Sequence, residues 1–279
     1  MKKIWMMLIG CCTAWTMANA AVVAYPGAGN VNFEEGTIEL WCSLPFDPEQ
    51  KVEKPIQPAT LFSIDLPGDP RKNSFTIALW MRPQQGDAQY NAIRTSLWVD
   101  GKGVGGPAIL MADWKKNELN HIAFTWQDGQ ASLFLNGKKC WSGKFAMPAG
   151  KVNPADVFLL AGGRAPNWQE QSKERREMLP EVFNLVTVEA LRVSSSAREF
   201  QEGMVVTAAP AADAATLLLD CYDKADFAAK KTNPAVIADG NGEKNGRIVG
   251  MFHTVDGKLG KGLALYPDRP LGRLVPGLK

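Results

Sequence analysis

The stretch that decides the fold is Asn120–Lys139, NHIAFTWQDGQASLFLNGKK. Two runs of alternating residues are separated by Asp128-Gly129, and the second run is closed by Asn136-Gly137. Asp-Gly and Asn-Gly are strong hairpin signals, because both central residues of a type I′ turn need a positive φ that these residues tolerate. The stretch therefore predicts three strands in an antiparallel meander.

The first strand of this meander is apolar on both faces. Ile122, Phe124 and Trp126 share one face, because successive side chains of a strand point to opposite sides, and Ala123 lies on the other. A strand that is apolar on both faces is buried on both. The meander is therefore expected to lie inside a sandwich.

Strand patterns recur along the chain at short intervals, with turn residues between them. They cover 36–44, 60–65, 74–82, 94–99, 107–112, 156–161 and 185–193 in addition to the meander. The chain has 279 residues, of which 46% are hydrophobic and 22% charged, as in an ordinary soluble protein with a sizeable core. The sequence predicts an all-β sandwich.

Residues 1–20 have the composition of a secretory signal and are set aside from the fold. Lys2-Lys3 precede an apolar run from 4 to 17, and Ala18-Asn19-Ala20 is a small-residue cleavage site. We expect cleavage after Ala20 and a secreted, periplasmic or cell-surface protein. The alternative is a lipoprotein acylated at Cys11, but the apolar region before Cys11 is short.

Charge and hydropathy exclude two classes of partner. Removal of residues 1–20 leaves 29 basic and 29 acidic residues, so the mature chain has no net charge to attract nucleic acid. No later segment approaches the ~20 apolar residues that span a bilayer, so no transmembrane segment is expected in the mature chain.

Three cysteines remain after removal of the signal: Cys42, Cys140 and Cys221. They can form at most one intramolecular disulfide, and their wide spacing is not a metal or redox motif. Cys42 and Cys140 would be the first pair to test. The simpler interpretation is that these residues are small buried hydrophobes.

The second half of the chain changes in composition near residue 204. Residues 204–216 include TAAPAADAAT and are interpreted as a linker. Residues 217–279 contain two further strand patterns, LLLDCYDK and DGKLGKGLAL, which are too few to close a sandwich. This segment is either an incomplete second unit or a set of strands added to the first domain.

Several of these strands together resemble a known domain. GTIELW at 36–41, LFSI at 61–64, the 121–126 strand and VEALRVS at 188–194 occur in the order and spacing of a laminin-G-like domain of the concanavalin A-like lectin/glucanase superfamily. The resemblance covers the domain at 21–203 and implies a jelly-roll sandwich of two antiparallel sheets. Leu119-Asn120-His121 departs from it, because the family often has Trp-His-His there.

The superfamily contains lectins, adhesion modules and glycoside hydrolases, so the resemblance leaves the function open. Related glucanases use Glu-x-Asp-x-Glu on one strand, and Glu35 and Glu39 have the outer spacing with Thr37 in the middle. Neither His121 nor His253 lies in a nucleophile motif. No catalytic residue is therefore predicted.

The resemblance implies that calcium is a possible cofactor, held at the rim of the sandwich. The stretch DGNGE at 239–243 looks like part of a calcium loop but lacks the Gly and Glu positions of an EF-hand. Asp100 and Asp128 are adequately explained as turn formers. The metal site stays unassigned.

Tryptophans near loop ends supply the candidate ligand site, because sugar rings pack on exposed indoles while neighbouring polar groups bind the hydroxyls. The candidate binding residues are Trp98, Asp100, Asp113, Trp114, Arg164 and Trp168. We expect a non-catalytic recognition module for carbohydrate or a cell-surface protein. The alternatives are a glycoside hydrolase or its accessory domain, and a structural domain of a truncated surface protein.

Overall fold

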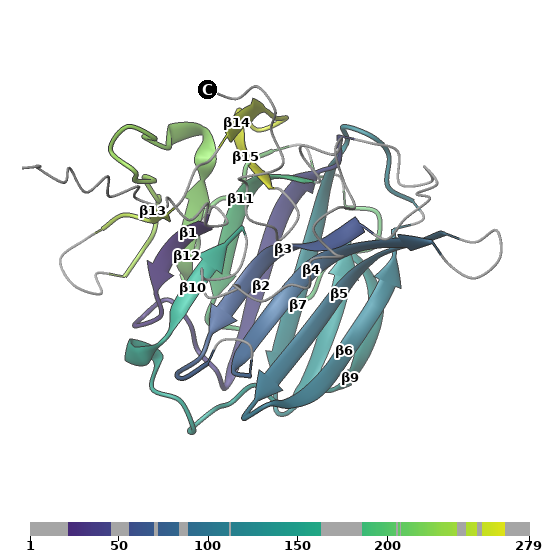
Figure 1. Cartoon of the computed structure of the whole chain (residues 1–279), viewed down its shortest axis with the longest axis vertical. Coiled ribbons are helices and arrows are strands. Elements are labelled where there is room, and N and C mark those ends of the chain that lie inside the picture. Colours follow the sequence, from purple (N-terminus) through teal and green to yellow (C-terminus); the bar gives the residue numbers. More distant parts are fainter. Residues whose placement is uncertain are drawn as a thin grey trace, which may run out of the picture.

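The computed structural model of the chain describes residues 22–45, 56–69, 72–83, 89–111, 113–162, 186–204, 206, 208–238, 244–249 and 253–265. Two antiparallel sheets lie one in front of the other (Figure 1), and the described helices are short 3-10 turns, Pro154–Asp156 and Tyr222–Lys224. The predicted all-β jelly-roll sandwich is confirmed.

The first sheet, called sheet A, has seven strands in the order β13-β1-β10-β3-β4-β5-β6. Their bounds are β1 Val22–Pro26, β3 Ile56–Asp65, β4 Ser74–Pro83, β5 Gln89–Val99, β6 Lys102–Leu110, β10 Phe158–Ala161 and β13 Arg247–Val249. The sequence analysis did not assign the short strands β1 and β13.

The second sheet, called sheet B, has the order β14-β15-β11-β2-β7-β8-β9, and β12 also pairs with β11. Their bounds are β2 Glu35–Ser43, β7 Leu119–Gln127, β8 Gln130–Leu135, β9 Lys138–Lys144, β11 Val186–Ser194, β12 Thr216–Cys221, β14 His253–Asp256 and β15 Lys261–Leu265. The predicted meander is β7-β8-β9, and its turn residues Asp128 and Asn136 have φ of 51° and 50°.

The core lies between the sheets and follows from strand alternation. Ile38, Leu40 and Cys42 of β2 face inward and are fully buried, while Glu39 and Trp41 face outward. β7 is buried from Asn120 to Trp126 on both faces, as its two apolar faces predict. Something other than the core must therefore cover the outer face of sheet B.

The cover is a segment that we call the strap, the described residues of 195–215. Phe200 packs its ring against His121 and Phe134 of sheet B, at centroid distances of 5.0 and 5.1 Å. The backbone N–H of Ser195 donates to the carbonyl oxygen of Ala215 at 2.8 Å. Ala215, in the stretch interpreted as a linker, is thus hydrogen-bonded next to the end of β11.

The C-terminal segment adds strands to both sheets. β12 pairs with β11 over Ala190–Ser194, and β15 pairs with the same edge of β11 over Val186–Val188. β13 pairs with β1 at the edge of sheet A. The sequence left open whether residues 217–279 form an incomplete second unit or add strands to the first domain. In the structure, these described strands pair with strands of the first domain.

The cysteines form no disulfide with one another, since Cys42, Cys140 and Cys221 are all unbridged. Cys42 lies on β2 and Cys140 on β9, three strands away and therefore about 14 Å apart. A disulfide needs Cα atoms within about 7 Å, so this pair cannot be bridged. Cys42 is a small buried hydrophobe, and burial raises the pKa of its thiol.

A buried carboxyl links the C-terminal segment to β1. Asp220 of β12 is fully buried; its Oδ2 accepts hydrogen bonds from Tyr25 Oη at 2.7 Å and from Thr232 Oγ1, and its Oδ1 has no partner. Burial without a neighbouring cation raises the pKa of Asp220 to about 6. The neutral acid is therefore the form that this site favours.

Removal of residues 207–279 should abolish cooperative folding. The deletion removes Leu218, Leu219, Leu263 and Leu265, which are buried against the sandwich. At ~2.5 kcal/mol per buried leucine the loss is roughly 10 kcal/mol, which is comparable to the whole stability of a domain. Thermal unfolding followed by circular dichroism measures this, and an unchanged melting temperature would refute the role of these strands.

The stability of the chain should fall as pH rises from about 4 to 6, by roughly 3 kcal/mol from Asp220 alone. The raised folded-state pKa means that the native state holds this proton more tightly than the unfolded state, so its contribution is present below pH 4 and lost above pH 6. Asp220→Asn should flatten this part of the profile in urea titrations, whereas Asp156→Asn, at an exposed carboxylate in the Pro154–Asp156 turn, should not. An equal slope in both variants would contradict the assignment.

Candidate functional site

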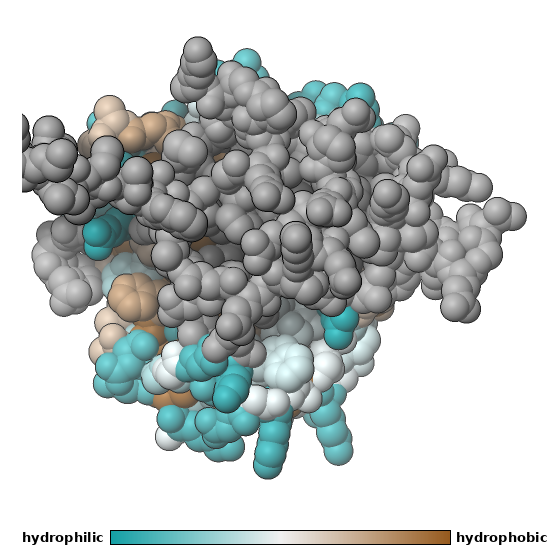
Figure 2. All heavy atoms as spheres, in the orientation of Figure 1, coloured by the Kyte–Doolittle hydropathy of each residue, from teal (hydrophilic) through white to brown (hydrophobic). Residues whose placement is uncertain are grey.

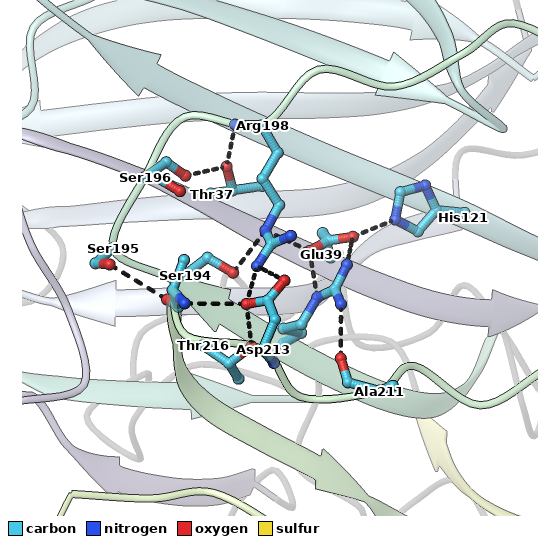
Figure 3. Close-up of polar contacts among 12 residues, drawn as sticks. Thr37, Glu39, His121, Ser194, Ser195, Ser196, Arg198, Ala211, Asp213 and Thr216 are labelled. Carbon is cyan, nitrogen blue, oxygen red and sulfur yellow. Dashed lines mark hydrogen bonds and ion pairs between the residues drawn. The ribbon is translucent and has the colours of Figure 1, made fainter.

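Polar groups are clustered in three parts of the described molecule. These are the outer face of sheet B, the outer face of sheet A, and a cleft at one end of the sandwich. The first is built around Glu39 (Figure 3). Arg192 Nε lies 2.6 Å from Glu39 Oε2, and Arg192 Nη2 and His121 Nε2 lie 2.7 and 3.0 Å from Oε1. Both carboxylate oxygens are thus occupied.

The Glu39 cluster is a structural site. Burial by itself would raise the pKa of Glu39, but the hydrogen bonds from His121 and Arg192 hold that pKa below its ordinary value. A carboxylate that is completely buried and paired on both oxygens offers neither a nucleophile nor a proton to a sugar. His121 is a buried structural residue that is hydrogen-bonded to Glu39.

A second ion pair fixes the strap over this cluster (Figure 3). Arg198 donates from Nη2 to both carboxylate oxygens of Asp213, at 2.7 and 2.8 Å, and from Nε to Ser194 Oγ at 2.9 Å. The hydrogen bond from Arg198 holds the pKa of Asp213 well below its usual range. Arg192 also donates to the carbonyl oxygen of Ala211 at 2.9 Å. Through these contacts the protein's own strap covers this part of the outer face of sheet B.

The structure describes four of the six candidate residues predicted from the sequence. Trp98 is 37% exposed at the end of β5, and Asp100 follows it in the turn to β6, with a φ of 50°. Asp113 is exposed, but Trp114 is only 4% exposed and packs in the core, so its expected exposed position is wrong. Arg164 and Trp168 lie outside the described residues.

The outer face of sheet A places Trp98 in a row of residues that crosses five strands. Phe158 pairs with Asp65, Asp65 with Ser74, Ser74 with Trp98, and Trp98 with Gly103. Their chain neighbours on the strands, including Ile64, Phe75 and Leu97, face the core, so the row itself points outward. We call this set the aromatic row.

The two ends of the aromatic row are exposed rings and its middle is polar. Phe158 is 58% exposed and Trp98 is 37% exposed, whereas Asp65 and Ser74 between them are buried. Ser74 Oγ has no hydrogen-bond partner in the structure. Trp98 lies flat against Gly103, because a Cβ at Gly103 would meet the indole ring at 3.2 Å.

A parallel row of small residues lies beside the aromatic row on the same face. Ser63 pairs with Thr76, and Thr76 with Ser96, where the two hydroxyl oxygens lie 2.7 Å apart. Ser63 Oγ donates to Asp65 Oδ1 at 3.4 Å, which joins the two rows. Figure 2 looks onto this side of the molecule, and hydrophilic residues predominate among those coloured along its lower edge.

Phe158, Asp65 and Ser74 were not predicted from the sequence as site residues. Each had been placed in or beside a strand pattern, and alternation alone shows which side of its own strand each occupies. Their meeting in one row depends on the register between β10, β3, β4 and β5, which a single sequence does not show.

Within the described residues, no three His, Cys, Asp or Glu side chains gather closely enough to hold a metal ion. The calcium-like stretch 239–243 lies outside the described residues. None of the described helices is long and apolar enough to cross a membrane.

No protein-family profile matches the sequence, and no curated protein matches it closely enough to count as a relative. Among solved structures, a candidate carbohydrate binding protein from Bacteroides ovatus superposes with a TM-score of 0.50 at 15% identity, over 84% of this chain and 57% of that one. This likeness supports a shared sandwich fold.

Two further solved structures are more distant. The enzymatically active domain of tailspike protein 2 from bacteriophage CBA120 gives a TM-score of 0.41 at 13% identity, over 63% of this chain and 24% of that one. The CBM40 of Ruminococcus gnavus IT-sialidase, bound to α2,3-sialyllactose, gives 0.32 at 16% identity, over 48% and 65%. The chain spans less than two thirds of each of these three neighbours.

Replacing Glu39 with Gln should destabilise the protein by about 3 kcal/mol, because Arg192 would keep its buried charge without a partner. Chemical unfolding measures this, with Glu118→Gln, which changes an exposed surface carboxylate, as the matched control. A loss below 1 kcal/mol for Glu39→Gln would show that the cluster does not hold sheet B together.

Proposed function

We propose that the protein is a secreted or cell-surface, non-catalytic glycan-binding module, and that the glycan lies on the outer face of sheet A. The observation that carries the proposal is the aromatic row, in which exposed rings of Phe158 and Trp98 flank Asp65 and Ser74. The likeness of fold to the Bacteroides ovatus protein agrees with this function but does not by itself assign it.

The row has the chemistry that a sugar needs. The C–H face of a pyranose packs on an aromatic ring, while its hydroxyl groups exchange hydrogen bonds with carboxylates and hydroxyls. Trp98 and Phe158 are separated by three strand spacings, or about 14 Å, with Asp65 and Ser74 between them. A glycan lying across the strands would contact both rings and reach the polar centre.

Ser74 supplies a specific reason to expect a polar ligand. A buried hydroxyl without a partner is unfavourable, and the cost is removed when a ligand hydroxyl supplies the missing hydrogen bond. The second row, in which Ser63 and Thr76 are buried and Ser96 is half-buried, continues this polar layer in the direction of the strands. Together the rows place hydrogen-bonding groups between two exposed rings.

The non-catalytic part of the proposal follows from the carboxylates. Glycoside hydrolysis uses two carboxyl groups that face one another across the bond to be cleaved. Asp65 is the one carboxylate in the two rows, and Glu39 is bound to Arg192 and His121 on the other sheet. We propose that the surface retains glycans without cleaving them.

The location and the cofactor are proposed on sequence grounds. Residues 1–20 carry the signal pattern that supports export, with acylation at Cys11 as the less favoured route. Calcium stays a candidate cofactor on the strength of the laminin-G resemblance, and it can be tested in the same experiment as binding.

Glycan-array binding of the chain without residues 1–20 tests the proposal, with calcium and again with chelator. Trp98→Ala and Phe158→Ala should each weaken retention about tenfold, because each removes a stacking ring. Val104→Ala is the matched control. Val104 is 42% exposed and lies on the β5–β6 hairpin, like Trp98. It pairs with the core-facing Leu97, so it lies on the face of sheet A opposite to the aromatic row.

Each outcome of the array has a defined meaning. Retention that depends on both rings and survives chelator supports calcium-independent glycan binding, and loss in chelator would assign a metal to it. Cleavage of retained sugars would overturn the non-catalytic assignment. Absence of binding in both conditions would overturn glycan recognition and favour a cell-surface protein as partner.

A further inference from the structure

A cleft of about 830 Å³ opens at one end of the sandwich. Its walls come from residues 32–35 before and at the start of β2, from residues 126–129 at the β7–β8 turn, and from within residues 145–150 after β9. This volume lies in the range of small-molecule sites in proteins. Nothing in the proposed glycan surface uses this cleft.

The three walls of the cleft are fixed to one another by hydrogen bonds. Trp126 Nε1 donates to the carbonyl oxygen of Asn32 at 3.1 Å, which ties the end of β7 to the first wall. Phe145 N donates to the carbonyl oxygen of Gly129 at 2.9 Å, which ties the third wall to the turn. The cleft is therefore formed before any ligand arrives, which lowers the cost of binding.

The base and the mouth of the cleft differ in chemistry. Trp126 and Phe145 are buried aromatic residues that line it, whereas Glu34 and Asp128 are exposed and Glu35 is half-buried. Because the two aromatic residues are buried, the lining that a ligand can touch is mainly polar, which suits a small ligand with several hydrogen-bonding groups.

The charge of the cleft has one sign. Its lining contains three carboxylates and no Lys, Arg or His. Among the described residues no ion pair reaches any of the three carboxylates. Three like charges around one cavity repel one another, and a cation bound between them would relieve that repulsion.

We propose that this cleft is a second binding site, and that its ligand is a sugar-sized molecule with a protonated primary amine, such as an amino sugar. Glu34, Glu35 and Asp128 supply the counter-charges for the ammonium group. The side chain of Gln127, also in the lining, is available to ring hydroxyls.

Isothermal titration with glucosamine oligomers tests the site, and the N-acetylated oligomers of equal length are the matched ligand without charge. The intact chain should bind the amine form at least tenfold more tightly, and the difference should shrink in 0.5 M salt because the attraction is partly exposed and screened. Glu34→Gln combined with Asp128→Asn should remove most of this preference. Asn tolerates the positive φ of 51° at position 128, so the turn is kept.

Asp156→Asn is the control variant, because Asp156 is an exposed carboxylate in a 3-10 turn outside the cleft, and it should leave the preference for the amine unchanged. Equal affinity for amine and N-acetylated oligomers, or an amine preference that survives the double variant, would overturn the proposal. Displacement of the amine by millimolar calcium at one ion per chain would also overturn it, by showing that the carboxylates form a metal site.

Discussion

The buried charge of Glu39 is the constraint on which the rest of the molecule depends. A carboxylate with no exposure to water is tolerated only if it is paired, and the pairing draws His121 of β7 and Arg192 of β11 to the centre of sheet B. Arg192 then reaches the strap at Ala211, and the neighbouring Arg198 reaches it at Asp213. One buried acid thus determines how three strands and the strap meet.

Much of the fold could be predicted from the sequence because it is encoded locally. The Asp-Gly and Asn-Gly turns fix a meander whose register follows from the turn itself, and the described structure has the positive φ values that they require. The alternation around Ile38 and Leu40 fixes the core side of β2 in the same way. The short strands β1 and β13 were not predicted because they are too short to show a periodic pattern. They are defined only by their pairing, of β1 with β10 and of β13 with β1.

The candidate site was harder to predict because it is a product of register between distant strands. Trp98 was identified from its position near a turn, but Trp114, chosen on the same grounds, is a core residue. The position of a tryptophan near a loop does not show which way its ring points. The residues that pair with it on neighbouring strands do show this. Phe158 and Asp65 are 93 positions apart in the chain and become neighbours only when β10 pairs with β3. No local pattern carries that information.

The unbridged cysteines have a consequence for how the fold responds to reducing conditions. Cys42 is sealed in the core between the sheets, where burial keeps its thiol protonated and poorly reactive. Cys221 is half-buried, and its pKa is raised to about 11. No disulfide joins the three described cysteines, so the described strands are held by packing, hydrogen bonds and ion pairs. Reducing conditions therefore break no bond among these three residues, and no described contact between strands is lost in them.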